Sequence, residues 1–109
     1  MVYHQELSHG RWSELTLAEQ LGNIGSEVSR MINWRDKDKD IAERAFERVL
    51  ELIDFTLANL HNKYRLREIA RSRELLVTHW IAGSPTSALE LDRLNKYFFQ
   101  FALLANSKS

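Results

Sequence analysis

The clearest helical pattern in the chain is Thr16-Leu-Ala-Glu-Gln-Leu-Gly-Asn-Ile-Gly-Ser-Glu-Val-Ser-Arg-Met-Ile-Asn-Trp34. Its first four residues form a capping box, because the Thr16 hydroxyl can accept a free backbone N–H and the Glu19 carboxylate can reach back. The apolar residues that follow fall within about 100° of arc on a helical wheel. They are Leu17, Leu21, Ile24, Val28, Met31 and Ile32. The stretch therefore predicts a helix over 17–34 with one buried face.

Small residues border this apolar stripe on one side, namely Ala18, Gly22, Gly25 and Ser29. Each glycine costs ~1 kcal/mol relative to alanine inside a helix. A second helix that approaches closely along this flank would offset that cost. A kink at the glycines is the alternative explanation.

Three further helices follow after short connections. A capping box at Asp40-Ile-Ala-Glu43 predicts a second helix over about 41–60. The apolar spacing predicts a third helix over about 65–82, which Gly83 ends. A capping box at Ser87-Ala-Leu-Glu90 starts the fourth helix.

Four amphipathic helices with short connections predict an all-α fold, an antiparallel up-down-up-down four-helix bundle. A sheet is disfavoured, because 1 proline and 4 glycines in 109 residues supply few tight turns. Residues 1–14 are rich in aromatic side chains, so we expect this N-terminal segment to pack over one end of the bundle. We expect the tail, 106–109, to fray. The chain 1–109 is then a single domain.

Composition excludes several classes of function. The chain has no cysteine, which removes disulfides, thiolate metal sites and cysteine nucleophiles. Lys plus Arg number 15 and Asp plus Glu number 15, so the overall charge does not indicate nucleic acid or anionic lipid as a partner. No apolar run approaches the ~20 residues of a membrane span, and the N-terminus is unlike a signal peptide. We therefore expect a soluble, cytoplasmic protein with no membrane association.

Metal and nucleotide sites are not indicated either. Di-iron sites in bundles need paired Glu-x-x-His motifs inside helices, whereas the one instance here, Glu6 to His9, precedes the first long helix. The carboxylates Glu43, Glu47 and Glu51 form a row on the polar side of their helix, where such rows are usually solvated. Gly22-Asn-Ile-Gly25 lies within a helix and follows no strand, unlike a nucleotide-binding loop. We expect no cofactor and no metal.

Five stretches carry a resemblance to a known family. They are Gly10-Arg-Trp12, Leu15 to Arg30, Ala45-Phe-Glu-Arg-Val-Leu-Glu-Leu-Ile-Asp54, Leu66-Arg-Glu-Ile and Lys96-Tyr-Phe-Phe-Gln-Phe-Ala102. On these residues the chain resembles a family of small uncharacterised bacterial helical-bundle proteins, most strongly from Glu19 to Arg30. The resemblance covers most of the chain and implies a natural helical domain. It implies no known activity and no catalytic residue.

Arg73 lies near the middle of the apolar face of the third predicted helix. A buried guanidinium without a partner is very costly, so it must meet a carboxylate or a path to water. Glu27 is the candidate partner, because it borders the apolar stripe of the first helix. We expect a buried polar network of Arg73 and Glu27 that fixes the register of the helices. An anion-binding site is the alternative.

The segment Arg73-Glu-Leu-Leu-Val-Thr-His79 is similar to the Arg-x(4–6)-His motif of the HEPN ribonucleases, which are also helical bundles. That resemblance implies an arginine and a histidine that act on a phosphodiester, the histidine as acid or base. This sequence departs from the motif at Glu74, where the family usually has Asn, Asp or His. The alternative is an ordinary surface histidine, about 120° around the helix from Arg73.

A basic row lies on the third predicted helix, where Lys63, Arg67 and Arg71 are spaced by four residues. Such a row could contact successive phosphates of a nucleic acid. The alternative is a set of surface ion pairs with the carboxylates of the second helix, Glu47, Glu51 and Asp54, each worth ~0–1 kcal/mol.

The fourth helix carries more apolar residues than one buried face needs. Phe99 and Leu103 point roughly opposite to the main stripe of that helix, and Leu89 also lies off it. Exposed patches of this kind commonly mark subunit or partner interfaces. The alternative is that residues 1–14 cover them.

The sequence therefore favours a non-enzymatic helical-bundle interaction module, a homo-oligomer or the partner of another protein, with Phe99, Leu103 and Leu89 as the candidate interface. A nucleic-acid-binding accessory protein that uses Lys63, Arg67 and Arg71 is the second hypothesis. A HEPN-like ribonuclease is the third.

Overall fold

The computed structural model describes residues 9–60 and 63–107. One short helix, α1 (His9–Trp12), precedes four long ones: α2 (Leu17–Trp34), α3 (Lys39–Asn59), α4 (Lys63–Ala82) and α5 (Pro85–Ser107). No strand occurs in these described ranges. The predicted all-α, four-helix fold is confirmed.

The first predicted cap is confirmed, and the caps of two later helices lie elsewhere than expected. Thr16 and Glu19 form the capping box of α2, each side chain accepting a backbone N–H from the other residue. The α3 cap is Asp38 rather than Asp40, and its carboxylate accepts the N–H groups of Asp40 and Ile41. An aspartate at this position satisfies two free amides at once, which starts the helix two residues early.

The start of α5 also differs from the prediction at Ser87. The Ser84 hydroxyl accepts the N–H of Ser87, and Pro85 occupies the first helical position. Proline is favoured there because the missing N–H needs no partner and its φ is already helical. At the other end, α5 continues through Ser107, and fraying of the tail 106–109 stays a prediction. Residues 108–109 lie outside the described chain.

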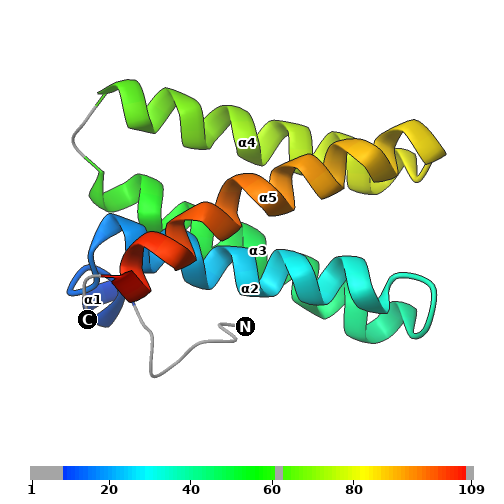
Figure 1. Cartoon of the computed structure of the whole chain (residues 1–109), viewed down its shortest axis with the longest axis horizontal. Coiled ribbons are helices and arrows are strands. Elements are labelled where there is room, and N and C mark those ends of the chain that lie inside the picture. The colour runs from blue at the N-terminus through cyan, green and yellow to red at the C-terminus, as the bar shows by residue number, and fades with distance from the viewer. Residues whose placement is uncertain (1–8, 61–62, 108–109) are drawn as a thin grey trace.

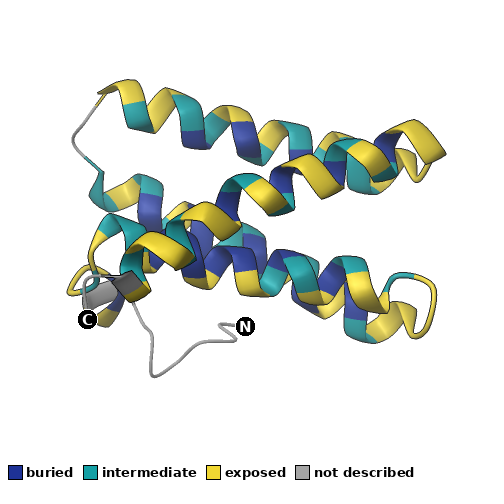
Figure 2. Ribbon diagram, in the orientation of Figure 1, coloured by how far each residue is buried: buried dark blue, intermediate teal, exposed yellow. Residues whose placement is uncertain are grey.

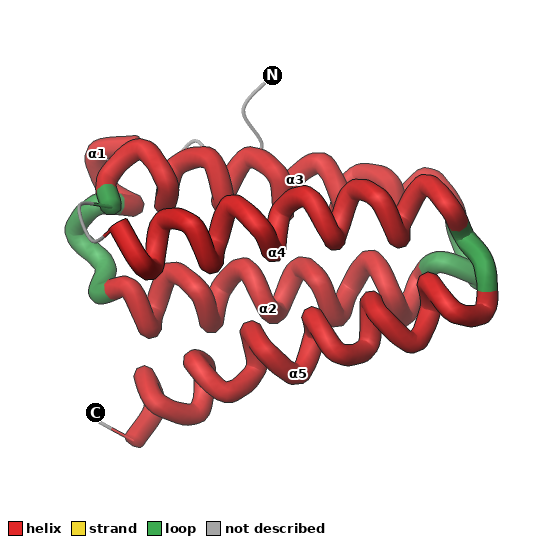
Figure 3. Tube along the Cα trace, turned by 90° about the horizontal axis from the view of Figure 1, so that it is seen from above, coloured by secondary structure: helices red, strands yellow, loops and turns green. Residues whose placement is uncertain are grey.

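The four long helices pack around a common core (Figure 1). The α2 helix packs most extensively against α5 and α3, whereas α4 packs against α5 and less extensively against α3. The chain direction reverses between successive long helices in Figure 1, and Figure 3 shows the α2–α3 and α4–α5 connections at the same end. Among the described residues, none of the helices is both long and apolar enough to cross a bilayer.

The core is formed by residues of α2, α3, α4 and α5 and takes in Trp12 of α1 (Figure 2). Trp12 is fully buried, and its indole N–H donates to the Thr56 hydroxyl over 2.8 Å. The Gln20 amide in turn donates to the Trp12 carbonyl over 2.8 Å. These hydrogen bonds give partners to polar groups that would otherwise be buried without one when the tryptophan is buried. Residues 1–8 lie outside the described chain, so packing of the whole segment 1–14 stays a prediction.

The glycines of α2 lie in close contact with α5. A Cβ built on Gly25 would lie 2.9 Å from the Phe98 Cβ, and one built on Gly22 would lie 3.0 Å from the Ala102 Cα. One turn further along, the Ser29 hydroxyl donates to the Asn95 side-chain oxygen over 2.8 Å. The small residues of α2 therefore bring α5 nearer than any larger side chains would allow.

This approach predicts that Gly25→Ala destabilises the protein, although alanine is the better helix former. We expect the free energy of unfolding to fall by about 1–3 kcal/mol, because the new Cβ forces Phe98 or its backbone to shift. Urea denaturation followed by circular dichroism measures the change. Asn23→Ala, at an exposed position of the same helix, is the matched control and should be neutral or stabilising. A stability gain in Gly25→Ala would show that the helices separate at no cost.

Candidate functional site

The exposed face of α5 carries the three predicted interface residues. Leu89 is 62 % exposed, Phe99 57 % and Leu103 57 %. Exposed residues, shown in yellow in Figure 2, follow α5 along most of its length. Within the described part of the chain no segment covers these side chains. Trp12, the one aromatic residue of 1–14 whose side chain is described, lies in the core instead.

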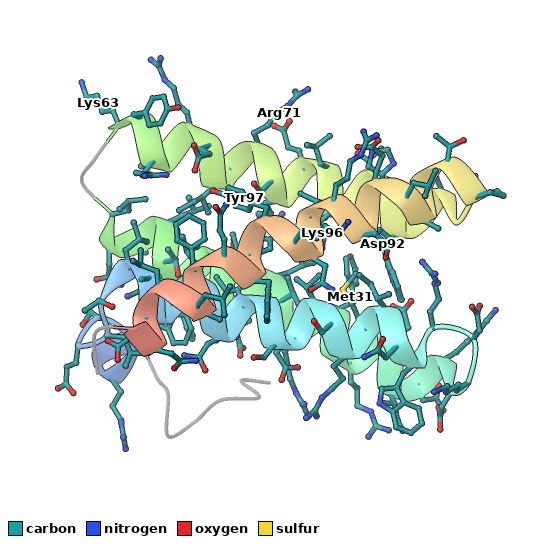
Figure 4. The ribbon with its side chains drawn as sticks, in the orientation of Figure 1. Met31, Lys63, Arg71, Asp92, Lys96 and Tyr97 are labelled. Carbon is teal, nitrogen blue, oxygen red and sulfur yellow. The ribbon has the colours of Figure 1, made fainter. Side chains whose placement is uncertain are left out.

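Two charged residues complete this face, and the sequence reasoning missed both. Asp92 and Lys96 are exposed and lie one helical turn apart on α5 (Figure 4). At about 100° per residue they fall between Leu89 and Phe99 in angle, inside an arc of about 80°. We call this set of five residues the α5 stripe: Leu89, Asp92, Lys96, Phe99 and Leu103. The sequence signal for this face was the spacing of its five residues, which alternates between three and four.

A shallow groove of about 300 Å³ runs beside Phe99, between α2 and α5. It is lined by Gly22, Gly25, Ser26, Ser29, Phe99 and Ala102. The groove exists because the side chains of this part of α2 are too small to fill the space next to the Phe99 ring. The face therefore presents protruding apolar side chains and a depression next to each other.

The predicted pair of Arg73 and Glu27 does not form, and that expectation is wrong. The Arg73 guanidinium instead binds Asp54 of α3 through two hydrogen bonds, of 2.9 and 3.3 Å. Glu27 lies 3.7 Å from the guanidinium of Arg48 on α3. The physical reason is which helices are neighbours. Because α4 packs beside α3 and α5, its arginine meets a carboxylate of α3. The Arg73 side chain is 35 % exposed, so this is a partly solvated ion pair rather than a buried network.

Arg73 and His79 do not form a common site. His79 Nδ1 lies 2.9 Å from the Ser87 hydroxyl of α5, whereas Arg73 faces α3. A phosphodiester would need both groups on one side of the helix. The arrangement therefore does not favour the hypothesis of a HEPN-like ribonuclease. His79 instead contributes to the contact between α4 and α5.

The basic row Lys63, Arg67 and Arg71 lies exposed along α4. Lys63 and Arg71 point away from the other helices in Figure 4. Arg71 lies 4.0 Å from Glu74 of the same helix, and neither Lys63 nor Arg67 has an ion pair with any described residue. The expected partner Asp54 is engaged by Arg73. The row is therefore accessible to a ligand.

A polar cluster between α4 and α5 was not foreseen. The Tyr97 hydroxyl donates a hydrogen bond to Glu68, whose carboxylate also accepts from Arg65 over 2.9 Å (Figure 4). Burial raises the pKa of the Tyr97 phenol, and the bond to the Glu68 carboxylate raises it further. Because Tyr97 also contacts the rings of Phe98 and Phe101 edge-on, it links the polar cluster to the core.

A larger cavity of about 730 Å³ lies at the end of the bundle where the two connections meet. Phe46 and Trp80 stack along it with ring centroids 5.6 Å apart, and the Trp80 indole donates to Glu43 over 2.9 Å. Its rim carries Arg35 and Lys39 together with Asp36 and Glu43. The charges on the rim are therefore balanced in number.

No group of three or more His, Cys, Asp or Glu side chains able to hold a metal ion occurs in residues 9–60 and 63–107. Comparison with known proteins found no matching family model, no matching curated protein and no matching solved structure. The resemblance to small uncharacterised bacterial bundle proteins therefore stays a prediction.

The Tyr97–Glu68 contact predicts a pH dependence of stability. A folded-state pKa above the ordinary value of about 10 stabilises the fold fully below that pH, and the contribution is lost as the pH rises above it. We expect the free energy of unfolding of the parent to fall more steeply between about pH 9 and about pH 11 than that of Tyr97→Phe. Urea denaturation at each pH measures both slopes. Equal slopes in the parent and Tyr97→Phe would contradict the contact.

Proposed function

We propose that this chain is a non-enzymatic interaction module of the cytoplasm that self-associates through the exposed apolar side chains of α5. The observation that carries the proposal is the exposure of Leu89, Phe99 and Leu103, each more than half accessible, on one face of one long helix. Apolar side chains scattered singly over a surface need no explanation, whereas several of them on one face of one helix commonly mark an interface.

The energetics favour a contact between two copies. Full burial of a leucine or phenylalanine side chain is worth ~1.5–3 kcal/mol, and about half of that remains to be gained at each of these positions. In a two-fold contact every side chain is buried twice, once from each copy. Several such gains are needed, because association itself costs about 4–15 kcal/mol of lost freedom.

The groove beside Phe99 supports the same conclusion. A symmetric contact must be self-complementary, with a projection and a depression on the same surface. The α5 face has the projecting Leu89 and the groove between Phe99 and α2, and both lie on the side of the molecule open to a second copy. Packing of a projecting side chain into such a groove is the usual core of a stable interface.

We expect the parent protein at ~100 µM to scatter light as an assembly larger than its 12.8 kDa monomer. The double variant Phe99→Asp with Leu103→Lys should scatter as a monomer, because charged side chains resist the burial that association requires. Its helical circular-dichroism signal should equal that of the parent, since both positions are exposed.

The matched control is Tyr64→Asp with Ile81→Lys, which changes two exposed apolar residues of α4 that are 71 % and 75 % accessible. This control should associate as the parent does. A parent protein that stays monomeric would refute self-association. A Phe99/Leu103 variant that unfolds would place these residues in the core of the chain.

A second candidate function is nucleic-acid binding through α4. It is supported by the exposure of Lys63, Arg67 and Arg71 and by the freedom of the first two from ion pairs with described residues. Residues four apart on a helix are neighbours along its axis, so the row offers a line of positive charge to a phosphate backbone.

Replacement of Lys63, Arg67 and Arg71 by glutamine tests this second function. If the row binds RNA or DNA, the variant should bind unrelated sequences more weakly, and its salt slope should be lower by roughly three units at most. Fluorescence anisotropy with labelled single- and double-stranded oligonucleotides over a range of salt concentrations measures both effects. Absence of binding by the parent at low salt would end the hypothesis.

A further inference from the structure

The α5 stripe has the spacing of a coiled-coil seam. Its members Leu89, Asp92, Lys96, Phe99 and Leu103 are separated by three, four, three and four residues, an average of 3.5. All five are exposed, so the whole seam is open on the surface of α5. Two helices that coil gently around each other keep contact along a seam of this period, which makes a second helix the fitting occupant.

The order of charges along the stripe indicates the direction of that second helix. In a parallel pair of α5 helices Asp92 would face Asp92 and Lys96 would face Lys96, and like charges at facing positions repel. In an antiparallel pair whose two-fold axis lies level with residue 94, Asp92 faces Lys96 in both halves of the contact. In the same register Leu89 faces Phe99, and Leu103 faces Pro85.

Other antiparallel registers lose this match. A pair centred between residues 97 and 98 would set Asp92 against Leu103 and Lys96 against Phe99, so that every charge would be buried against an apolar side chain. A pair centred on residue 96 would set Lys96 against itself. The register at residue 94 is the one of these that joins charge to opposite charge and apolar side chain to apolar side chain.

We propose that two copies of this chain pair through antiparallel α5 helices about a two-fold axis at residue 94, with Asp92 of each copy opposite Lys96 of the other. This geometry rests on the self-association proposed above and specifies it. Two observations support it beyond the spacing. Neither Asp92 nor Lys96 forms an ion pair with any residue that the structure describes, whereas the adjacent Glu90 and Arg93 pair with each other at 2.8 Å.

The groove between α2 and α5 gives the second observation. The proposed register places Leu89 of the second copy beside Phe99, next to the depression lined by Gly22 and Ser26. The small side chains of α2 therefore leave room at the point where the proposed partner helix adds a leucine.

Charge reversal tests the geometry. Asp92→Lys alone opposes lysine to lysine, Lys96→Asp alone opposes aspartate to aspartate, and the two-fold axis applies each repulsion twice. We expect either single variant to raise the dissociation constant of the pair by about tenfold or more. The double variant, Asp92→Lys with Lys96→Asp, should return to within a few-fold of the parent value. Sedimentation velocity over a concentration series measures all four proteins.

Mixing the two single variants is the sharper experiment. An equimolar mixture of Asp92→Lys and Lys96→Asp should form a heterodimer, because every facing pair then joins opposite charges. Native mass spectrometry distinguishes this species from either homodimer by its mass. Lys37→Asp and Asp36→Lys change the net charge by the same amounts at exposed positions elsewhere, and these controls should leave association unchanged.

The outcomes separate this geometry from the self-association on which it rests. A monomeric parent would overturn both. A parent that associates while the single reversals have no effect, or while the double variant is not restored, would overturn the antiparallel α5 pair and leave self-association standing. Restoration together with heterodimer formation is the expected result.

Discussion

The close approach of α2 and α5 at Gly22 and Gly25 determines how the rest of the bundle is arranged. A Cβ built on Gly25 would lie only 2.9 Å from the Phe98 Cβ, so the two helices are too near for any side chain at this position. This places Phe98 fully inside the core, because no side chain of α2 stands between it and the interior. Since residues 98 and 99 point about 100° apart on a helix, the burial of Phe98 turns Phe99 toward the outside.

The same constraint affects α4. With α5 close to α2, α4 packs mainly against α5 and less extensively against α3. Its attachment therefore depends on polar and aromatic contacts more than on a continuous apolar face. Tyr97 and Glu68 join it to α5, whereas the Arg73–Asp54 ion pair and the Phe46–Trp80 stack join it to α3. This is consistent with the burial of only three residues of α4, two of them apolar.

Periodicity and capping predicted the helices, because both depend on residues close together in the chain. The wheel of the first helix also identified the small-residue flank and its use for close packing. A helical wheel cannot identify which helix lies opposite a given face. Arg73 was therefore assigned to Glu27 of α2, whereas its true partner is on α3. The Tyr97–Glu68 contact was missed for the same reason. It joins residues 29 apart in sequence, and no local pattern marks such a pair.

The exposure of Phe99 and Leu103 was predictable because a helix can bury only one arc against its neighbours. The interior arc of α5 is already occupied by Leu91, Leu94 and Phe98. Any apolar residue on the opposite arc is then left to solvent unless another chain covers it. Keeping a phenylalanine and two leucines there makes the protein prone to nonspecific association, and charges placed between them at a coiled-coil spacing restrict which pairings are favourable. In the proposed α5 pair, the apolar residues of the stripe therefore supply affinity and its two opposite charges set the direction of the partner helix.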